Sequence, residues 1–327
     1  MLGGTDEQVA QQPRKCLKLH TDAIFVCGGR RSLCYFPEQN VWYKLSDMLF
    51  QHDFRSNPSQ CRDKIYIPCQ GSDQLGGSSL MAFHAPSANS CGAFQVSKAF
   101  TNIAVLKDHL YATTEEIFYS LMSSKFEIYR YDPEKNCCNQ LKKPHTNLFH
   151  SCVVTDEQYI YLIGGSTSSL FGAPVSTTYR CDPSADDHEW EEVAPINKAR
   201  RDACGAAMNG KVYIAGGQQG PLTLATCEVY NPVTNEWQLI PSLKIPRMSA
   251  SMVCYEGTLY VLGGVNNSSR VLSVEKFNSK QSKWKEISFI PVDCFETREE
   301  KKQENKFKAC SARLCKEVID KLEPLKE

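Results

Sequence analysis

The side chains that most often bind metals or act as nucleophiles are abundant in this chain, but their spacing does not build a site. Its seven histidines are scattered, and neither an HxH nor an HExxH spacing occurs. Its sixteen cysteines include no CxxC pair, so neither a zinc ribbon nor a thioredoxin-like redox site is indicated. The acidic run from Asp186 to Glu189 lies in a predicted turn before Trp190, which favours a solvated turn over a cation site. We therefore expect no catalytic residue, no metal and no cofactor.

The cysteines instead suggest packing in a reducing compartment. Cys152, Cys204, Cys254 and Cys310 lie in short apolar segments, where a reduced cysteine acts as a small hydrophobe. The pair Cys137-Cys138 is open to a redox interpretation, but we predict a packing role for it. No apolar signal segment and no run of 18 apolar residues is present, which predicts a cytosolic protein that does not span a membrane.

Arginine and lysine together number 37, and so do aspartate and glutamate, so the net charge is zero. A broad nucleic-acid surface requires an excess of cationic charge, so this balance argues against nucleic acid as the partner. A local basic rim is still compatible with it.

The elements that would position any site come from an internal repeat. An apolar strand is followed by a glycine pair, a tyrosine or phenylalanine, an Asn/Asp-Pro-like turn and a tryptophan. The clear copies are Tyr161–Trp190, Tyr213–Trp237, Tyr260–Trp284 and, at the N-terminus, Phe25–Trp42. Two copies are degenerate: Ile65–Phe94 keeps one glycine, and Leu110–Cys138 has Thr113-Thr114 in place of the glycines and Cys138 in place of the tryptophan. The steps of about 42 to 52 residues are typical of propeller blades.

Elementary physical chemistry supports this interpretation of the repeat. Glycine permits a positive φ at a strand end, proline presets φ in a turn, and tryptophan fills the gap between adjacent sheets. A single four-stranded sheet cannot bury both of its faces, whereas sheets packed radially cover one another. The sequence therefore predicts an all-β, six-bladed β-propeller.

Closure of the ring is predicted at the C-terminal end. Phe307–Ala312 repeats the inner-strand pattern of Arg201–Ala206, yet no glycine strand follows it. We predict that Ala309–Leu314 is the inner strand of the first blade; the alternative is that Cys16–His20 fills this place. The predicted organisation is a linker or expression-derived edge (1–14), the propeller (15–314), and a short helix or frayed tail (315–327). The charged segment 296–308 is predicted to be a solvated helix or linker.

These motifs, above all the glycine pairs that begin at Gly164, Gly216 and Gly263, resemble those of the Kelch-repeat propeller over roughly residues 20 to 314. More narrowly, the chain resembles the Kelch domain of a BTB–BACK–Kelch protein of the kelch-repeat-and-BTB-domain-containing group. The resemblance implies a non-catalytic, cytoplasmic module that recognises substrates for a Cullin-3 RING ubiquitin ligase. In that architecture the BTB and BACK parts bind Cullin-3 and dimerise, and we expect them outside these residues and the isolated propeller to be monomeric.

In such propellers, the loops after the glycine pairs and the loops that enter the inner strands share one face, and loops on a rigid scaffold commonly bind partners. The residue just before each inner strand should lie around the channel mouth. Those six positions are Arg55, Phe100, His150, Asp202, Ser249 and Lys308. Further predicted contacts from the loops are Arg30, Arg31, Leu170, Phe171, Arg200, Arg201, Gln219 and Arg247. Because arginine pairs with carboxylates and phosphates, we expect a pocket that is partly cationic.

Two other functional classes compete with this interpretation. An actin-binding Kelch scaffold would have the same ring motifs. A Kelch-like enzyme is disfavoured, because a copper oxidase needs a Tyr/His cluster and a sialidase needs repeated Ser-x-Asp-x-Gly-x-Thr-Trp turns, and neither pattern occurs.

Overall fold

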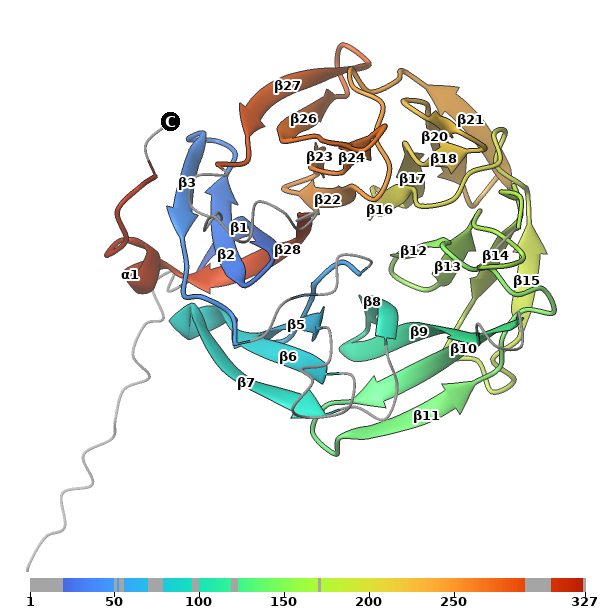
Figure 1. Ribbon diagram of the computed structural model, residues 1–327, viewed down its shortest axis with the longest axis horizontal. Coiled ribbons are helices and arrows are strands. Elements are labelled where there is room, and N and C mark those ends of the chain that lie inside the picture. Colours follow the sequence, from blue (N-terminus) through green and yellow to red (C-terminus); the bar gives the residue numbers. More distant parts are fainter. Residues whose placement is uncertain are drawn as a thin grey trace, which may run out of the picture.

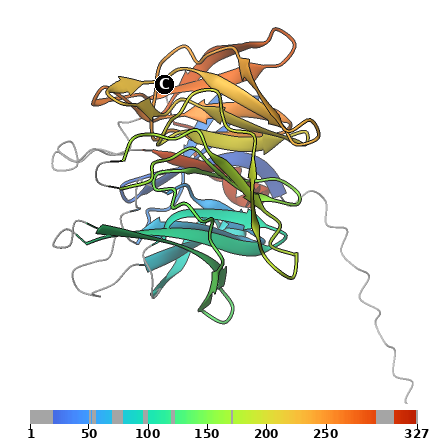
Figure 2. The same cartoon turned by 90° about the vertical axis from the view of Figure 1, so that its right-hand side faces the viewer.

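The computed structural model describes residues 20–49, 52, 56–69, 79–95, 100–118, 123–169, 172–291 and 307–325. These residues form six four-stranded antiparallel sheets and two two-stranded ribbons. Figure 1 shows the sheets arranged radially about a central axis, and Figure 2 shows the same ring from its side. The predicted six-bladed propeller is therefore confirmed.

The blades are described with the inner strand first. Blade one contains β28 (Lys308–Cys315), β1 (His20–Gly28), β2 (Arg31–Phe36) and β3 (Val41–Lys44). Blade two contains β4 (Ser59–Cys61), β5 (Lys64–Cys69), β6 (Ser79–His84) and β7 (Asn89–Gln95). Blade three contains β8 (Phe100–Leu106), β9 (His109–Phe118), β10 (Ser123–Asp132) and β11 (Cys137–Leu141).

Blade four contains β12 (Cys152–Thr155), β13 (Ile160–Ile163), β14 (Thr178–Cys181) and β15 (Trp190–Val193). Blade five contains β16 (Cys204–Met208), β17 (Lys211–Ala215), β20 (Cys227–Asn231) and β21 (Glu236–Ile240), with the ribbon β18 (Gln218–Gln219) and β19 (Leu222–Thr223). Blade six contains β22 (Ser251–Tyr255), β23 (Thr258–Leu262), β26 (Ser273–Asn278) and β27 (Lys283–Phe289), with the ribbon β24 (Val265–Asn266) and β25 (Ser269–Arg270). Among the described residues, the helical pieces are the 3-10 turn η1 (Ala85–Ser87) and α1 (Lys316–Ile319).

The inner strands surround the axis. They contact one another in the cyclic order β28, β4, β8, β12, β16, β22 and back to β28. The apolar core lies between the blades: Tyr161 and Ile163 of blade four, for example, pack with Val212 and Tyr230 of blade five. Each sheet thus buries its faces against its neighbours, which is the requirement that the repeat predicts.

The two ends of the described chain meet in blade one. β28 pairs antiparallel with β1 from His20↔Cys315 to Cys27↔Lys308, which confirms closure by the C-terminal strand. The predicted α1 follows, with Ile319 buried against blade one, and the Leu325 N–H donates to the Trp42 carbonyl at 2.8 Å. Figure 1 shows α1 beside β28.

At four of the junctions between blades, a tryptophan indole N–H is hydrogen-bonded to the preceding blade. The indole N–H of Trp237 donates to the Ala194 carbonyl of the preceding blade at 2.9 Å. Trp190 and Trp284 make the equivalent bond to a carbonyl at the end of the preceding blade, whereas the Trp42 indole N–H donates to the Ser288 hydroxyl of blade six at 3.0 Å. In blade three, Cys138 pairs with Tyr131 in the register that Trp237 has with Tyr230, so the predicted substitution of cysteine for tryptophan is confirmed.

The glycine pairs turn the chain at the end of the second strand. In blade five, Gly216 and Gly217 have φ values of +64° and +97°, and a Cβ on Gly216 would lie 2.2 Å from the Arg247 carbonyl oxygen. An L side chain is excluded there by conformation and by space. Blade three lacks this pair at Thr113-Thr114, and its strand β9 continues to Phe118, paired with Ser123 of β10. The degenerate repeat therefore produces a longer hairpin.

Several predictions fall outside the described residues. These are the segment 1–14, most of the alternative strand Cys16–His20, most of the charged segment, and Leu170 and Phe171 in the insert of blade four. Over the described part of the chain, no helix has the length and apolar character needed to cross a bilayer.

Closure predicts that removal of residues 307–327 will destabilise the whole ring. The deletion removes β28 and the buried side chains of Ala309, Ala312 and Leu314. Each large apolar side chain contributes about 1.5–3 kcal/mol when buried, and folding free energies are only about 5–15 kcal/mol. We expect loss of the cooperative melting transition, measured by circular dichroism. Removal of residues 321–327 alone, which spares β28 and α1, is the control and should lower the melting temperature only slightly. An unchanged transition in the longer deletion would show that closure does not depend on β28.

Candidate functional site

A cavity of about 240 Å³ opens at the end of the axis where the inner strands begin. Each of the six blades contributes to its lining. The polar and charged residues of this lining, which we call the channel mouth, are Asn57, Thr101, Asn102, Glu115, His150, Ser151, Asp202, Ser249 and Lys308. This convergence of all the blades at one cavity makes the channel mouth the candidate binding site.

The backbone of the mouth is held in an unusual conformation. His150, Asp202 and Ser249 all have left-handed φ values, of +55°, +54° and +54°. The Asp202 N–H donates to the His150 carbonyl at 3.0 Å, and the Ser249 N–H donates to the Asp202 carbonyl at 2.8 Å. Such conformations cost about 1–3 kcal/mol per residue and persist where surrounding contacts fix them. Bonds from blade to blade therefore set the directions of these side chains.

Three titratable side chains converge on one side of the mouth. The carboxylate of Glu115 accepts the His150 backbone N–H at 2.8 Å. The His150 imidazole Nδ1 lies 3.8 Å from Glu115 Oε2 and 3.6 Å from Asp202 Oδ1. The Glu115 side chain is only 5 % exposed, whereas those of His150 and Asp202 are about a quarter exposed. An imidazole between two carboxylates gives this side of the cavity an acidic character.

The rest of the lining adds a buried ammonium group and hydroxyl groups. Lys308 is 5 % exposed, and its Nζ donates to the Ala250 carbonyl at 3.4 Å. The Thr101 hydroxyl donates to the Thr113 carbonyl at 3.2 Å. Ser151 is 6 % exposed, and its hydroxyl has no hydrogen-bond partner among the described residues. Because buried hydroxyls are ordinarily bonded, this one is a candidate to bind a ligand or water.

Of the six predicted ring positions, the structure brings four together. His150, Asp202, Ser249 and Lys308 all line the mouth, although Lys308 is buried. Phe100 does not line it: its ring packs against Tyr131 in the core between blades two and three, at a centroid distance of 5.9 Å. A register shift in β8 between Phe100 and Asn102 accompanies this placement, and Thr101 and Asn102 line the mouth instead. Arg55 lies outside the described residues.

The predicted cationic loops are only partly available to a partner. Arg30 is exposed, and its Nε donates to the Met48 carbonyl at 3.4 Å. Arg31 forms an ion pair with Asp47. Arg201 donates from Nε and Nη2 to the side-chain oxygen of Gln218, at 3.2 and 3.1 Å.

Gln219 is exposed on the ribbon of blade five, as a loop contact requires. Backbone bridges pair Phe149 with Ser166, Arg201 with Gln218 and Met248 with Val265. The loops after the glycine pairs and the loops entering the inner strands therefore lie together in blades four to six. Binding of a partner at these loops stays a prediction.

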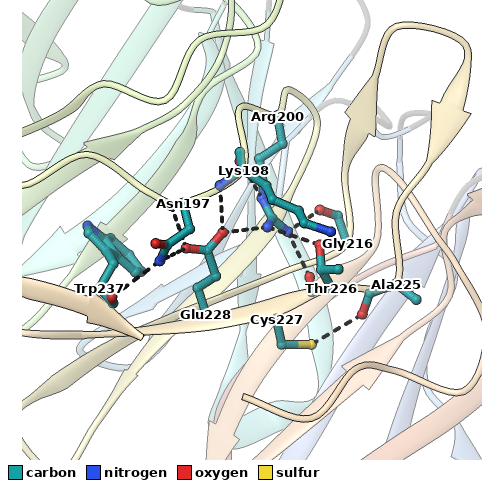
Figure 3. Close-up of polar contacts among 9 residues, drawn as sticks. All are labelled: Asn197, Lys198, Arg200, Gly216, Ala225, Thr226, Cys227, Glu228 and Trp237. Carbon is teal, nitrogen blue, oxygen red and sulfur yellow. Dashed lines mark hydrogen bonds and ion pairs between the residues drawn. The ribbon is translucent and has the colours of Figure 1, made fainter. Parts of the chain in front are cut away.

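The placement of Arg200 and Arg247 on the rim is wrong. Both side chains are fully buried inside blades five and six. Arg200 donates from Nη1 to the carbonyls of Gly216 and Thr226, at 2.8 and 2.7 Å, and from Nη2 to Glu228 at 2.6 Å (Figure 3). Every guanidinium nitrogen is bonded, so nothing remains to bind a partner.

Each of these arginines joins two blades. The Arg200 carbonyl accepts the Gly165 N–H of blade four at 2.8 Å, while its guanidinium is bound within blade five. Arg247 repeats the arrangement with Gly217 of blade five and Glu275 of blade six, and its Nη2–Oε1 distance to Glu275 is 2.5 Å. Burial lowers the pKa of both arginines, and the paired glutamates oppose that shift. We call these two units the arginine clamps.

Glu115 is the site residue that sequence reasoning missed. It directly follows Thr113-Thr114, the position that Ser166, Gln218 and Val265 hold after the glycine pairs of the regular blades. That alignment was sufficient to place it on the mouth face.

The predicted role of the cysteines as small hydrophobes agrees with their environment. Burial raises the pKa of Cys204 to about 11, even though Arg247 and Lys308 oppose the shift. Burial likewise raises the pKa of Cys152 and Cys310. Within the described ranges, no three His, Cys, Asp or Glu side chains are grouped as a metal site would need.

Comparison with known proteins agrees with this architecture. Residues 122–293 match the family model of the KLHDC2/KLHL20/DRC7 Kelch-repeats domain. Human Kelch-like protein 33 is 36 % identical over 76 residues, which are 23 % of this chain and 14 % of that protein. Spermatocyte protein spe-26 of Caenorhabditis elegans is 32 % identical over 104 residues, which are 30 % of this chain and 17 % of that protein. The aligned stretches are thus less than a fifth of the length of either relative.

Among solved structures, that of YjhT superposes with a TM-score of 0.63, over 80 % of this chain and 95 % of that one. The sequence identity is 13 %, so this likeness concerns the fold alone.

The arginine clamps predict an asymmetric response to mutation. Arg247→Met leaves Glu275 charged and buried without its partner, which should cost about 3–5 kcal/mol of unfolding free energy. The double variant Arg247→Met/Glu275→Leu removes both charges and should recover much of that loss. Urea denaturation measures both.

The matched control is Arg313→Met, because Arg313 forms an exposed pair with Asp22 at 3.3 Å. Such a surface pair contributes below about 1 kcal/mol. Equal losses for Arg247→Met and Arg313→Met would show that the clamp does not hold the blades together.

Proposed function

Because this chain belongs to the Kelch-repeats domain family, we propose that it is the substrate-recognition module of a Cullin-3 RING ubiquitin ligase. In this proposal the propeller binds a substrate protein or peptide, and a BTB–BACK region contacts Cullin-3. The propeller itself is non-catalytic and works in the cytoplasm. The Kelch-like relatives support a protein-interaction role, and the ligase assignment goes beyond them.

The channel mouth is the observation that carries the binding role. It gathers polar and charged side chains from all six blades around one cavity, on backbone held by bonds between blades. Preorganised side chains lose little conformational entropy on binding, so a rigid rim favours specific recognition of a protein segment. The loop ribbons of blades five and six, with Gln219 and exposed Leu222, extend the surface beyond the cavity.

The test is to block the mouth without unfolding the ring. Ser249→Tyr places an aromatic ring at the rim, and its backbone should tolerate this because His150 has a ring side chain at the equivalent position with nearly the same φ. In the full-length protein with its BTB–BACK region, we expect at least about a tenfold loss of substrate capture, equivalent to about 1.4 kcal/mol. Cullin-3 co-precipitation should not change, and ubiquitylation of the captured protein should fall.

The matched control is Leu239→Tyr, on the exposed outer strand β21, which should leave capture intact. Equal capture by the wild-type and Ser249→Tyr proteins would overturn binding at the mouth. If the protein captures a partner but Cullin-3 does not co-precipitate, and if the propeller co-sediments with actin filaments, the ligase assignment is overturned in favour of a cytoskeletal scaffold.

A further inference from the structure

The charged side chains that line the channel mouth already have partners within the ring. The Glu115 carboxylate accepts the His150 backbone N–H at 2.8 Å, and Asp202 Oδ1 lies 3.6 Å from the His150 imidazole Nδ1. The other carboxylate oxygen of Asp202 lies 3.9 Å from Arg201 Nε, and the Lys308 ammonium group donates to a backbone carbonyl at 3.4 Å. Because a charged ligand must also give up its hydration, it gains little from groups that are paired in this way.

Four uncharged side chains of the same lining have hydrogen-bonding capacity that the protein does not use. They are Asn57 before β4, Asn102 in β8, Ser151 before β12 and Ser249 before β22, and they come from blades two, three, four and six. The Ser151 hydroxyl is buried and has no hydrogen-bond partner among the described residues. Over the same part of the chain, the side chains of Asn102 and Ser249 are partly exposed and have no protein partner. The uncharged groups are therefore the part of the lining that is open to a ligand.

The fold fixes the positions of these groups before any ligand is bound. The Ser251 hydroxyl donates to Asn57 Oδ1 at 2.8 Å, so the Asn57 amide nitrogen is the end of that group that is left to donate. The register shift at the start of β8 places Asn102 at the mouth, as bulges beside binding sites commonly do. Ser249 has a φ of +54°, and its backbone N–H is bonded to blade five. Groups held in this way lose little conformational entropy on binding.

The chemistry of these groups matches an uncharged amide. A hydroxyl both donates and accepts, and an asparagine side chain has an NH2 donor and a carbonyl acceptor. A bound amide likewise needs donors for its oxygen and acceptors for its NH2 group, whereas a carboxylate only accepts and an ammonium group only donates. Transfer of an amide from water into a protein interior also costs far less than transfer of an unpaired charge.

The size of the cavity restricts the ligand to one side chain. Its volume of about 240 Å³ is below the range of roughly 300–1,000 Å³ found for pockets that enclose whole drug-sized molecules. A side chain that enters the cavity would leave its own backbone at the rim, within reach of the surrounding loops.

Resting on the function proposed above, we propose that the channel mouth binds the side-chain amide of a glutamine or asparagine residue of the substrate protein. The NH2 group of Asn57 donates to the carbonyl oxygen of the bound amide, and the hydroxyls of Ser151 and Ser249 accept from its NH2 group. Asn102, which can both donate and accept, completes the set from blade three.

The experiment measures retention of peptide pools by the intact chain. Each pool is a nine-residue peptide, acetylated and amidated, whose centre is fixed as glutamine, asparagine, glutamate, lysine or norleucine and whose flanks are randomised without asparagine and glutamine. We expect the glutamine and asparagine pools to be retained about tenfold more than the other three, equivalent to about 1.4 kcal/mol. A site built to hydrogen-bond an amide rejects analogues that leave its polar groups unpaired. Raising the salt concentration should leave this preference unchanged, whereas screening would weaken retention of a charged anchor.

Two substitutions remove hydrogen-bonding groups from the mouth with little change of size. Asn102→Leu replaces the amide by an apolar group of similar shape, and Ser249→Ala removes one hydroxyl. Each should lower the preference for the amide pools, and the double variant should abolish most of it. Both positions are partly exposed, so the melting temperature, measured by circular dichroism, should change little. If Asn102→Leu impairs folding, Ser249→Ala gives the same comparison.

The matched control is Asn139→Leu in the same blade. Asn139 is exposed on β11 and does not line the mouth. This variant should retain the glutamine and asparagine pools like the wild-type chain. An equal loss of preference in Asn139→Leu and Asn102→Leu would overturn the assignment of amide binding to the mouth.

The outcomes separate this inference from the proposed function. Equal retention of the glutamine and norleucine pools, or a preference for the glutamate or lysine pool, overturns the amide anchor. If Ser249→Tyr abolishes substrate capture in that case, the mouth is still the binding site. If Ser249→Tyr also leaves capture intact, both proposals fail.

Discussion

The pairing of β28 with β1 is the constraint on which the rest of the propeller depends. It joins residues almost 300 positions apart in the sequence, from His20↔Cys315 to Cys27↔Lys308. Without it, blade one would have no inner strand, and both ends of the array would expose sheet edges, which invite aggregation. With it, every inner strand has a neighbour on each side, and the channel mouth has a complete wall.

Within the closed ring, buried polar bonds fix how one blade sits against the next. The arginine clamps satisfy each guanidinium nitrogen while their carbonyls accept from the glycine pair of the preceding blade. The tryptophans make an analogous bond at the outer edge. Apolar packing is non-directional, so it cannot by itself set the angle between blades. Hydrogen bonds of fixed geometry supply that direction and place the rim residues.

The channel mouth consequently combines residues of the regular blades four to six with residues of the degenerate blade three. Blades four, five and six place His150, Asp202 and Ser249 in one left-handed backbone conformation and bond them in series. Blade three has threonines in place of the glycine pair, and its strand β9 continues to Phe118. Glu115 of this strand therefore accepts a hydrogen bond from the His150 backbone N–H. A degenerate repeat thus supplies the acidic group that distinguishes this cavity from a symmetric one.

The sequence by itself determined the number of blades, the substitution of Cys138 for tryptophan and four of the six ring positions, and it favoured the C-terminal segment over Cys16–His20 as the closing strand. These follow from spacing and periodicity, which are local properties of a repeat. Only the tertiary structure decided which polar side chains face the cavity. Arg200 and Arg247 look like loop cations, yet they are buried because partners 28 residues away, Glu228 and Glu275, neutralise them inside the blade. Phe100 lies in the core and Thr101 and Asn102 line the mouth instead, because the register of β8 shifts between Phe100 and Asn102. That shift depends on strand pairing, which a degenerate motif does not encode locally.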